Sequence, residues 1–167
     1  MAVLDETDRE FLNRAIDLSA AALREAGKTP FGSVVVTDGQ IAGEGTASVI
    51  QQSDPTAHAE VVALRRAGSR LRRHLFEGAT VYSSSEPCPM CLTACYWARV
   101  ARVVFAATSR DVADYGFEDL QFYREIRNPP RRRSLPGDPA GEPLRERAAA
   151  VLRAWAVQAP GQAEPKL

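Results

Sequence analysis

The chain has 167 residues, with 21 basic and 21 acidic groups and no formal net charge. This length favours one domain with a core of its own, since domains average about 150 residues. Apolar residues make up 45% and charged residues 25%, a globular composition that argues against wholesale disorder. A protein without net charge has no long-range electrostatic attraction to polyanions such as nucleic acids. No apolar run is long enough to span a membrane. We expect one domain over residues 1–158 and a polar tail over 159–167.

The three cysteines all lie between Cys88 and Cys95. An odd, clustered set makes a poor disulfide framework and is typical of a metal or catalytic site in a reducing compartment. The first eight residues are acidic where a secretory leader would be basic and then apolar. We therefore expect a cytoplasmic protein.

The first half of the chain predicts a helix, a β-hairpin and a second helix. The predicted elements are a helix over 4–26, strands over 31–37 and 41–49, and a helix over 56–67. Gly27 ends the first helix, where a C-terminal glycine is typical. Asp38-Gly39 is a hairpin-turn dipeptide between the two strands.

The second half predicts a parallel crossover followed by helices. The predicted elements are a strand over 80–85, a helix over 88–99, a strand over 102–108, helical structure beyond 111, a proline-rich linker over 128–143 and a helix over 142–157. Strand, helix and strand with short joints imply a right-handed parallel connection. We expect a mixed sheet with helices on both faces.

Two short segments carry the chemistry, Pro55-Thr-Ala-His58-Ala-Glu60 and Glu86-Pro-Cys88-Pro-Met-Cys91. One histidine and two thiolates suit a tetrahedral zinc ion. Both segments fall at predicted helix starts, where the helix dipole favours a thiolate. Three protein ligands leave one position for water, the arrangement of a catalytic zinc.

The spacing of His58 and Glu60 suits two different roles at one site. Residues two apart on one helical turn point in different directions, so one binds metal while the other reaches the substrate. Zinc lowers the pKa of bound water to about 7 and so supplies hydroxide. Glu60 would take the water proton and deliver it to a ring nitrogen and a leaving amine. Cys95 could add a fourth ligand and make the zinc structural, but its apolar neighbours favour core packing.

At these residues the chain resembles the cytidine and deoxycytidylate deaminase superfamily, in its nucleobase branch. The resemblance covers about residues 28–133 and includes Pro30-Phe-Gly and both motifs. Two further segments, 96–99 and 113–120, look most like those of bacterial guanine deaminases. The resemblance implies an α/β fold, a three-layer α/β/α arrangement with a five-stranded mixed sheet. It also implies a homodimer, with possible exchange of the C-terminal segment.

The resemblance implies a role for each matching residue. One Zn²⁺ per chain would be held by His58, Cys88 and Cys91. Glu60 and Asp119 would be catalytic. The substrate contacts would come from Phe31, Ala59, Trp97 and Asp119. The implied reaction is hydrolytic deamination of a free nucleobase, guanine to xanthine plus ammonia, with no membrane partner.

Two departures from the family pattern leave other substrates open. Ala47 stands where the family usually has an asparagine that contacts the base, and a lost polar contact can shift base choice by orders of magnitude. No aromatic residue follows Trp155, whereas the guanine deaminases close a partner's site with one. Cytosine, isoguanine or an aminotriazine is therefore an alternative substrate.

Two further classes of function compete with deamination of a free base. Deamination of adenosine in transfer RNA would need a basic face, which the arginines at 70, 72 and 73 or at 131–133 could supply. Steep salt dependence of RNA binding would mark that class. A non-catalytic zinc module is the other, and Glu60 argues against it because a structural site has no use for that carboxylate.

Overall fold

The computed structural model describes residues 3–158. Tertiary contacts divide the chain into two compact units, Met1–Arg124 and Glu125–Leu167. The expected single domain over 1–158 stays a prediction, and the expected polar tail over 159–167 lies outside the described residues. None of the helices in residues 3–158 combines the length and apolar character needed to cross a bilayer.

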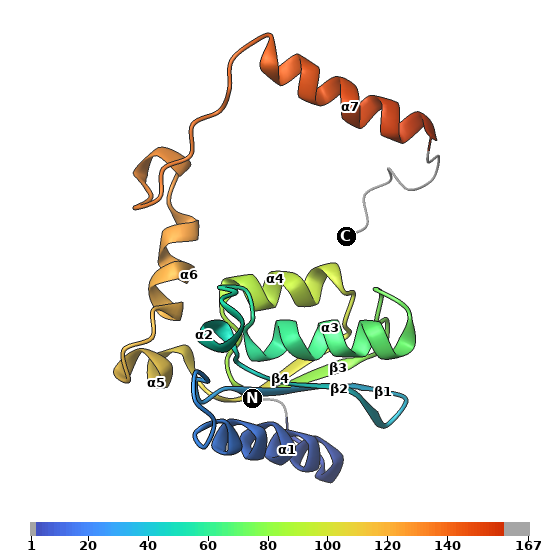
Figure 1. Ribbon diagram of the computed structural model, residues 1–167, viewed down its shortest axis with the longest axis vertical. Coiled ribbons are helices and arrows are strands. Elements are labelled where there is room, and N and C mark those ends of the chain that lie inside the picture. The colour runs from blue at the N-terminus through green and yellow to red at the C-terminus, as the bar shows by residue number, and fades with distance from the viewer. Residues whose placement is uncertain (1–2, 159–167) are drawn as a thin grey trace. The chain divides into compact units, whose positions relative to one another are not determined.

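The first unit alternates helices with short strands (Figure 1). Its elements are α1 (Glu6–Ala22), β1 (Gly32–Thr37), β2 (Gln40–Thr46), α2 (Val49–Gln52), α3 (Ala59–Leu71), β3 (Thr80–Ser85), α4 (Pro89–Trp97), β4 (Arg102–Ala107) and α5 (Ser109–Asp114). Helix α6 (Asp119–Arg127) crosses the boundary between the units. The second strand ends earlier than expected, and the short α2 was not predicted.

The sheet has the order β2-β1-β3-β4. Strand β1 is antiparallel to β2 and β3, with Val34 opposite Tyr82, and β3 is parallel to β4 through the α4 crossover. The mixed sheet is confirmed, but the expected count of five strands is wrong, because the described residues form four. Beyond β4, Thr108 caps α5 and turns the chain into helices. Residues 128–143 then hold five prolines, which cannot donate ladder hydrogen bonds.

Helices cover both faces of this sheet (Figure 1). On one face, α1 buries Phe11, Leu12 and Ala15 against residues of β1, β3 and β4. On the other, α3 and α4 bury a second cluster that includes Leu64 and Cys95. The three-layer α/β/α arrangement is therefore confirmed.

The second unit contains a short 3-10 helix (Pro130–Arg132) and α7 (Leu144–Gln158). Ser134 donates its N–H and its hydroxyl to Glu125, and Arg133 donates to the carbonyl of Asn128, which orders the proline-rich stretch. No residue of α7 is buried within the described chain. Its exposed apolar side chains recur at helical spacing, at Leu144, Val151, Leu152 and Trp155.

Candidate active site

A tight turn ahead of α3 sets the position of His58. Asp54 accepts hydrogen bonds from the N–H of Thr56 (2.8 Å) and its hydroxyl (2.6 Å), and Arg65 forms an ion pair with the same carboxylate (3.0 Å). His58 keeps an extended backbone as the N-cap residue, and the helix begins at Ala59. The imidazole therefore lies at the positive end of the helix dipole.

The turn ahead of α4 sets the two cysteines in the same way. Cys88 is the N-cap residue with an extended backbone, and Pro89 opens the helix, where its missing N–H costs nothing. Cys91 follows in the first turn, so both sulfurs lie near the helix start. The carboxylate of Glu86 accepts from the N–H (2.8 Å) and hydroxyl (2.6 Å) of Ser109, which ties this turn to α5.

The structure brings the three predicted ligands together. Nδ1 of His58 lies 3.6 Å from Sγ of Cys88, and Sγ of Cys88 lies 3.5 Å from Sγ of Cys91. The three donor atoms all lie within 4.8 Å of one another. A tetrahedral zinc ion with bonds of about 2.0–2.3 Å separates its ligands by roughly 3.5 Å. The donor set therefore fits zinc in both chemistry and spacing.

The carboxylate of Glu60 is buried beside these ligands and has one fixed oxygen. The hydroxyl of Ser83 on β3 donates to Oε1 of Glu60 over 2.6 Å. That bond leaves Oε2 for another proton donor. Ser83 was missed in the sequence, although a serine inside a buried β-branched and aromatic strand is a polar group that needs a partner.

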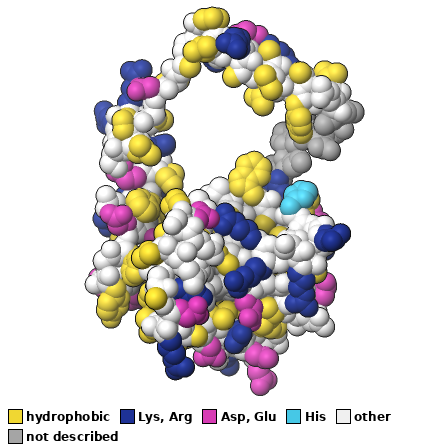
Figure 2. Space-filling view, viewed as in Figure 1, with side chains coloured by type: hydrophobic (Ala, Val, Ile, Leu, Met, Phe, Trp, Pro, Cys, Tyr) yellow, Lys and Arg dark blue, Asp and Glu magenta, His cyan; other side chains and the backbone are white. Residues whose placement is uncertain are grey.

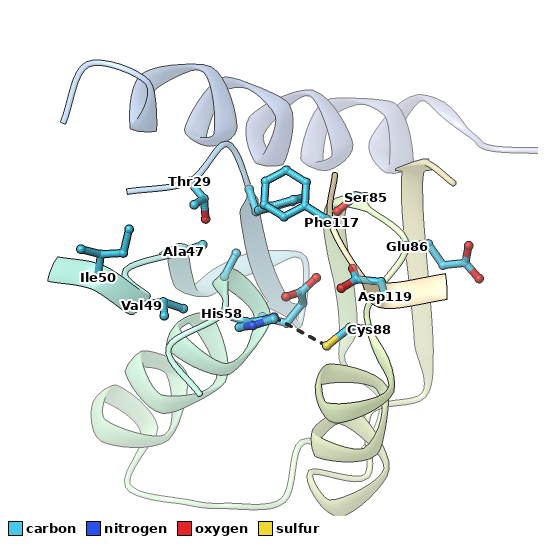
Figure 3. Close-up of a pocket in the computed structure, with 13 residues that line it drawn as sticks. Thr29, Ala47, Val49, Ile50, His58, Ser85, Glu86, Cys88, Phe117 and Asp119 are labelled. Atoms are coloured by element: carbon cyan, nitrogen blue, oxygen red, sulfur yellow. Dashed lines mark hydrogen bonds between the residues drawn. The ribbon is translucent and has the colours of Figure 1, made fainter. Parts of the chain in front are cut away.

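A cavity of about 290 Å³ opens over this cluster (Figure 3). One side is apolar and includes Ala47, Val49 and Ile50, while Asp119 lies on the opposite side with Cys88. The complete lining is Thr29, Phe31, Ala47, Val49, Ile50, His58, Ala59, Glu60, Ser85, Glu86, Cys88, Phe117 and Asp119. The carboxylate of Glu86 points away from the cavity toward its bond with Ser109.

Three of the four predicted substrate-contact residues line this cavity: Phe31, Ala59 and Asp119. The Phe31 ring meets the Phe117 ring edge to face, with centroids 4.8 Å apart at 80°. Trp97 does not line it. Its side chain, at the last turn of α4, is 74% exposed, and its predicted contact with the base stays a prediction.

Several lining residues were not predicted, among them Thr29, Ser85 and Phe117. Thr29 lies in the loop ahead of β1, and Phe117 in the loop between α5 and α6, so both reach the cavity from distant parts of the sequence. Only the Gly116-Phe117 pair inside the segment that resembles guanine deaminases could have pointed to one of them.

Burial and neighbouring groups shift the pKa values of Cys88, Cys91 and Asp119. The contact with Cys91, and then the His58 ring, lower the pKa of Cys88 well below its usual range, while the same contact raises the pKa of Cys91. A thiolate is therefore favoured at Cys88. Burial, and then the charge of Cys88, raise the pKa of Asp119 to about 6.

Cys95 lies outside the ligand cluster. Its side chain is buried with Leu64, Phe76 and Val81 in the core beneath α3 and α4. Burial raises the pKa of its thiol to about 12, which disfavours a thiolate ligand. Core packing, the favoured sequence reading, agrees with this position.

Known proteins are similar to this chain in sequence and in fold. Guanine deaminase of Bacillus subtilis (strain 168) is 44% identical over 126 residues, which cover 75% of this chain and 81% of that protein. The X-ray structure of guanine deaminase from Bacillus subtilis matches with a TM-score of 0.86 at 36% identity, covering 98% of this chain and 100% of that chain. A tRNA-specific adenosine deaminase of Buchnera aphidicola (subsp. Schizaphis graminum) is 41% identical over 88 residues, 53% of this chain and 58% of that protein.

The family match covers the sheet and both ligand segments. Residues 5–107 match the cytidine and deoxycytidylate deaminase zinc-binding region, which includes His58, Glu60, Cys88 and Cys91. That span is well over half of the chain. The protein therefore belongs to the cytidine and deoxycytidylate deaminase family.

Proposed function

We propose that the protein is a zinc-dependent hydrolytic deaminase of a free nucleobase, and that guanine is its substrate. The observation that carries this proposal is one cavity in which two carboxylates, Glu60 and Asp119, meet the His58, Cys88 and Cys91 cluster. The 44% identity to a guanine deaminase, over three quarters of the chain, favours guanine among the bases.

The reaction adds water to guanine and releases xanthine and ammonia. A bond from the amine-bearing ring carbon to the water oxygen forms, and the bond from that carbon to the amine breaks. Bound zinc would supply a Lewis acid that lowers the pKa of water to about 7. Its ligands on this chain would be His58, Cys88 and Cys91.

Glu60 moves the protons in this proposal. Ser83 holds Oε1, so Oε2 is the oxygen that can accept a proton from water and pass it to the ring nitrogen. Asp119 lies on the other side of the cavity, half-buried, and can accept hydrogen bonds from the amine that leaves. At that place Asp119 would pass the second proton of the added water to the amine, which leaves as ammonia.

The aromatic residues Phe31 and Phe117 give the base an apolar place to stack. Ala47 and Ile50 form a wall without side-chain hydrogen-bonding groups. The base would therefore be oriented by the carboxylates, by backbone groups such as those of Ala59, and by the hydroxyls of Thr29 and Ser85.

Transfer RNA is a weaker candidate substrate. The adenosine deaminase from Buchnera matches over only 53% of this chain. On the face shown in Figure 2, basic and acidic side chains are interspersed over the sheet-bearing unit. A duplex phosphate backbone would instead favour a continuous basic surface.

We also propose a homodimer in which the C-terminal segments are exchanged, in the cytoplasm, where thiolate ligands stay reduced. Helix α7 supports the exchange, because its exposed stripe of Leu144, Val151, Leu152 and Trp155 needs an apolar partner. A mass in solution of twice one chain, lost on removal of residues 142–167, is the expected result. A monomeric full chain would contradict it.

The proposal is tested by ammonia release from guanine, cytosine, isoguanine, an aminotriazine, adenosine and transfer RNA. Guanine turnover is expected in the wild type and should fall about 10³-fold or more in Glu60→Gln at equal zinc content, because proton transfer is lost. Glu77→Gln, at an exposed position, is the matched control and should keep full activity. Turnover of another base would contradict guanine as substrate, and inactivity of the zinc-loaded wild type on every substrate would contradict the proposed reaction.

A further inference from the structure

Helix α6 carries Asp119 but has little packing of its own. None of its residues is buried. Within residues 3–158, a single hydrogen bond joins it to the sheet and its covering helices, from Oη of Tyr123 to the carbonyl of Pro87 over 2.7 Å. The position of Asp119 in the cavity therefore depends on few contacts.

Tyr123 and Asp119 lie on the same face of α6, since residues four apart on a helix are neighbours. Two residues before Asp119, the Phe117 ring packs edge to face on Phe31. The segment is thus held on both sides of Asp119, by an aromatic contact before it and a hydrogen bond after it. A helix held at both points cannot rotate Asp119 out of the cavity without breaking one of them.

The acceptor of this bond is itself fixed. Pro87 is fully buried, and the preceding Glu86 is tied to Ser109. The following residue is Cys88, the N-cap of α4 and a member of the ligand cluster. Burial raises the pKa of Tyr123 to about 12, so the phenol is a proton donor throughout the neutral range. The bond therefore connects α6, the helix that carries Asp119, to the segment that carries Cys88.

We propose that Tyr123 is a positioning residue that fixes the distance between Asp119 and the Cys88 segment. The proposal rests on the function proposed above, because it assigns Tyr123 to the same reaction. The Tyr123 hydroxyl touches a backbone carbonyl, so it acts on the chemistry through Asp119. Losing this hydroxyl frees α6 to move and leaves the Pro87 carbonyl without its partner.

The first test compares Tyr123→Phe with Tyr115→Phe, a control at a tyrosine that is 84% exposed in the same segment. Tyr123→Phe is expected to lower kcat for guanine about tenfold with little change in KM, whereas Tyr115→Phe keeps the wild-type kcat. Zinc content should stay at one per chain in both. An unchanged kcat in Tyr123→Phe, or a loss of zinc that accounts for the lower rate, would overturn the proposal.

The second test asks whether Tyr123 acts through Asp119. In the Asp119→Asn background, adding Tyr123→Phe should lower kcat no further, because the group that it positions is already disabled. A merely structural tyrosine would lower kcat tenfold again. Such an additive result would refute the positioning role.

A third measurement is independent of turnover. Amides of α6 should exchange hydrogen about fivefold faster in Tyr123→Phe than in Tyr115→Phe, while amides of α1 exchange at the same rate in both. Equal exchange in α6 would refute the proposal. If the wild type deaminates no substrate but exchange in α6 still differs, the proposed reaction fails while Tyr123 is shown to hold α6.

Discussion

The two faces of the sheet use similar packing but serve different purposes. On the α1 face, Gly32 lies so close to the helix that an added Cβ would be 2.3 Å from the carbonyl oxygen of Ala15. On the α3 face, a Cβ on Gly45 would be 2.1 Å from the carbonyl oxygen of Ala59. Both helices approach the sheet through a glycine, but only the second contact involves the first residue of a helix that begins beside a predicted metal ligand, His58.

The α3 face therefore combines folding and chemistry in the same contacts. Gly45 meets the first turn of α3, immediately after His58, and Gly43 meets a later turn at Ala63 and Ala67. Ser83 of β3, which is separated from β2 by β1, reaches the same turn of α3 and donates its hydroxyl to Glu60. The α1 face instead holds an ion pair between Asp8 and Arg102, far along the strands from any ligand. Substitutions on the two faces should therefore separate stability from zinc binding.

The largest expected effect comes from Gly45→Ala. The new methyl group would overlap the backbone of α3 at Ala59 and Ala63, so the helix start must shift. We expect a loss of about 3 kcal/mol in the free energy of unfolding, which lowers Tm by roughly 6–12 °C. Because the shift displaces His58 and Glu60, zinc affinity and kcat should fall as well. Thermal unfolding, zinc titration and guanine turnover measure the three effects.

Gly32→Ala is the matched control for the opposite face. It should cost a similar amount of stability, since its Cβ would overlap the backbone of α1 at Ala15 and Ser19. Zinc affinity of the folded protein should stay at the wild-type value. Equal losses of zinc affinity in the two variants would show that the faces are not separable. Gly141→Ala, where a Cβ meets nothing within 4 Å, should change none of these quantities.

The next effect is a pH dependence on the α1 face. Asp8 accepts two hydrogen bonds from Arg102 (2.7 and 2.8 Å) and one from Tyr82 (2.8 Å). The Arg102 guanidinium holds the pKa of the buried Asp8 carboxyl below its ordinary value. A lowered folded-state pKa contributes stability that is complete above the unfolded value of about 3.9 and is lost as pH falls through the folded value.

Asp8→Asn should therefore lower the free energy of unfolding by about 2 kcal/mol at pH 7. The difference from wild type should shrink as the pH falls below about 4, because the Asp8 carboxylate of the unfolded chain binds a proton there while that of the folded chain stays ionised to lower pH. Urea unfolding at pH 7, 5 and 3.5 measures this difference in the free energy of unfolding. Release of zinc at low pH affects both proteins and therefore cancels in the difference. The exposed Asp17→Asn on the same helix is the control. A difference that stays constant with pH would contradict the assignment to Asp8 ionisation.

The ligand cluster could be predicted from the sequence because its chemistry is local. His58 and Glu60 share one helical turn, Cys88 and Cys91 another, and both turns carry their own helix-start residues. Strands β1, β3 and β4 were also predicted to within one residue of their observed ends, since runs of β-branched residues mark them. The residue pattern predicts four strands, the number that the described residues form, whereas the fifth strand was implied by the family resemblance alone.

The surroundings of the cluster depend on tertiary contacts and were therefore missed. Ser83 becomes a partner of Glu60 only when α3 packs on β3. Phe117, in the loop before α6, reaches the cavity from far along the chain, and Tyr123 of α6 reaches the segment ahead of α4 in the same way. Ala47, by contrast, was singled out in the sequence and does line the cavity, as part of its apolar wall.

The smallest expected effect comes from the third cysteine, Cys95. Its substitution tests whether this residue belongs to the core on the α3 face or to the ligand cluster. Cys95 packs between α4 and the sheet with Phe76 and Val81 among its neighbours. Cys95→Ala removes one buried sulfur and should lower the free energy of unfolding by about 1 kcal/mol through the small cavity left behind. Zinc should stay at one per chain, with unchanged affinity and kcat, because the ligand set is complete without this thiol. Cys91→Ala is the counterpart one turn earlier and should abolish tight zinc binding. If Cys95→Ala lost its zinc in the same way, the thiol would be a fourth ligand, and the open position required for catalysis would not exist.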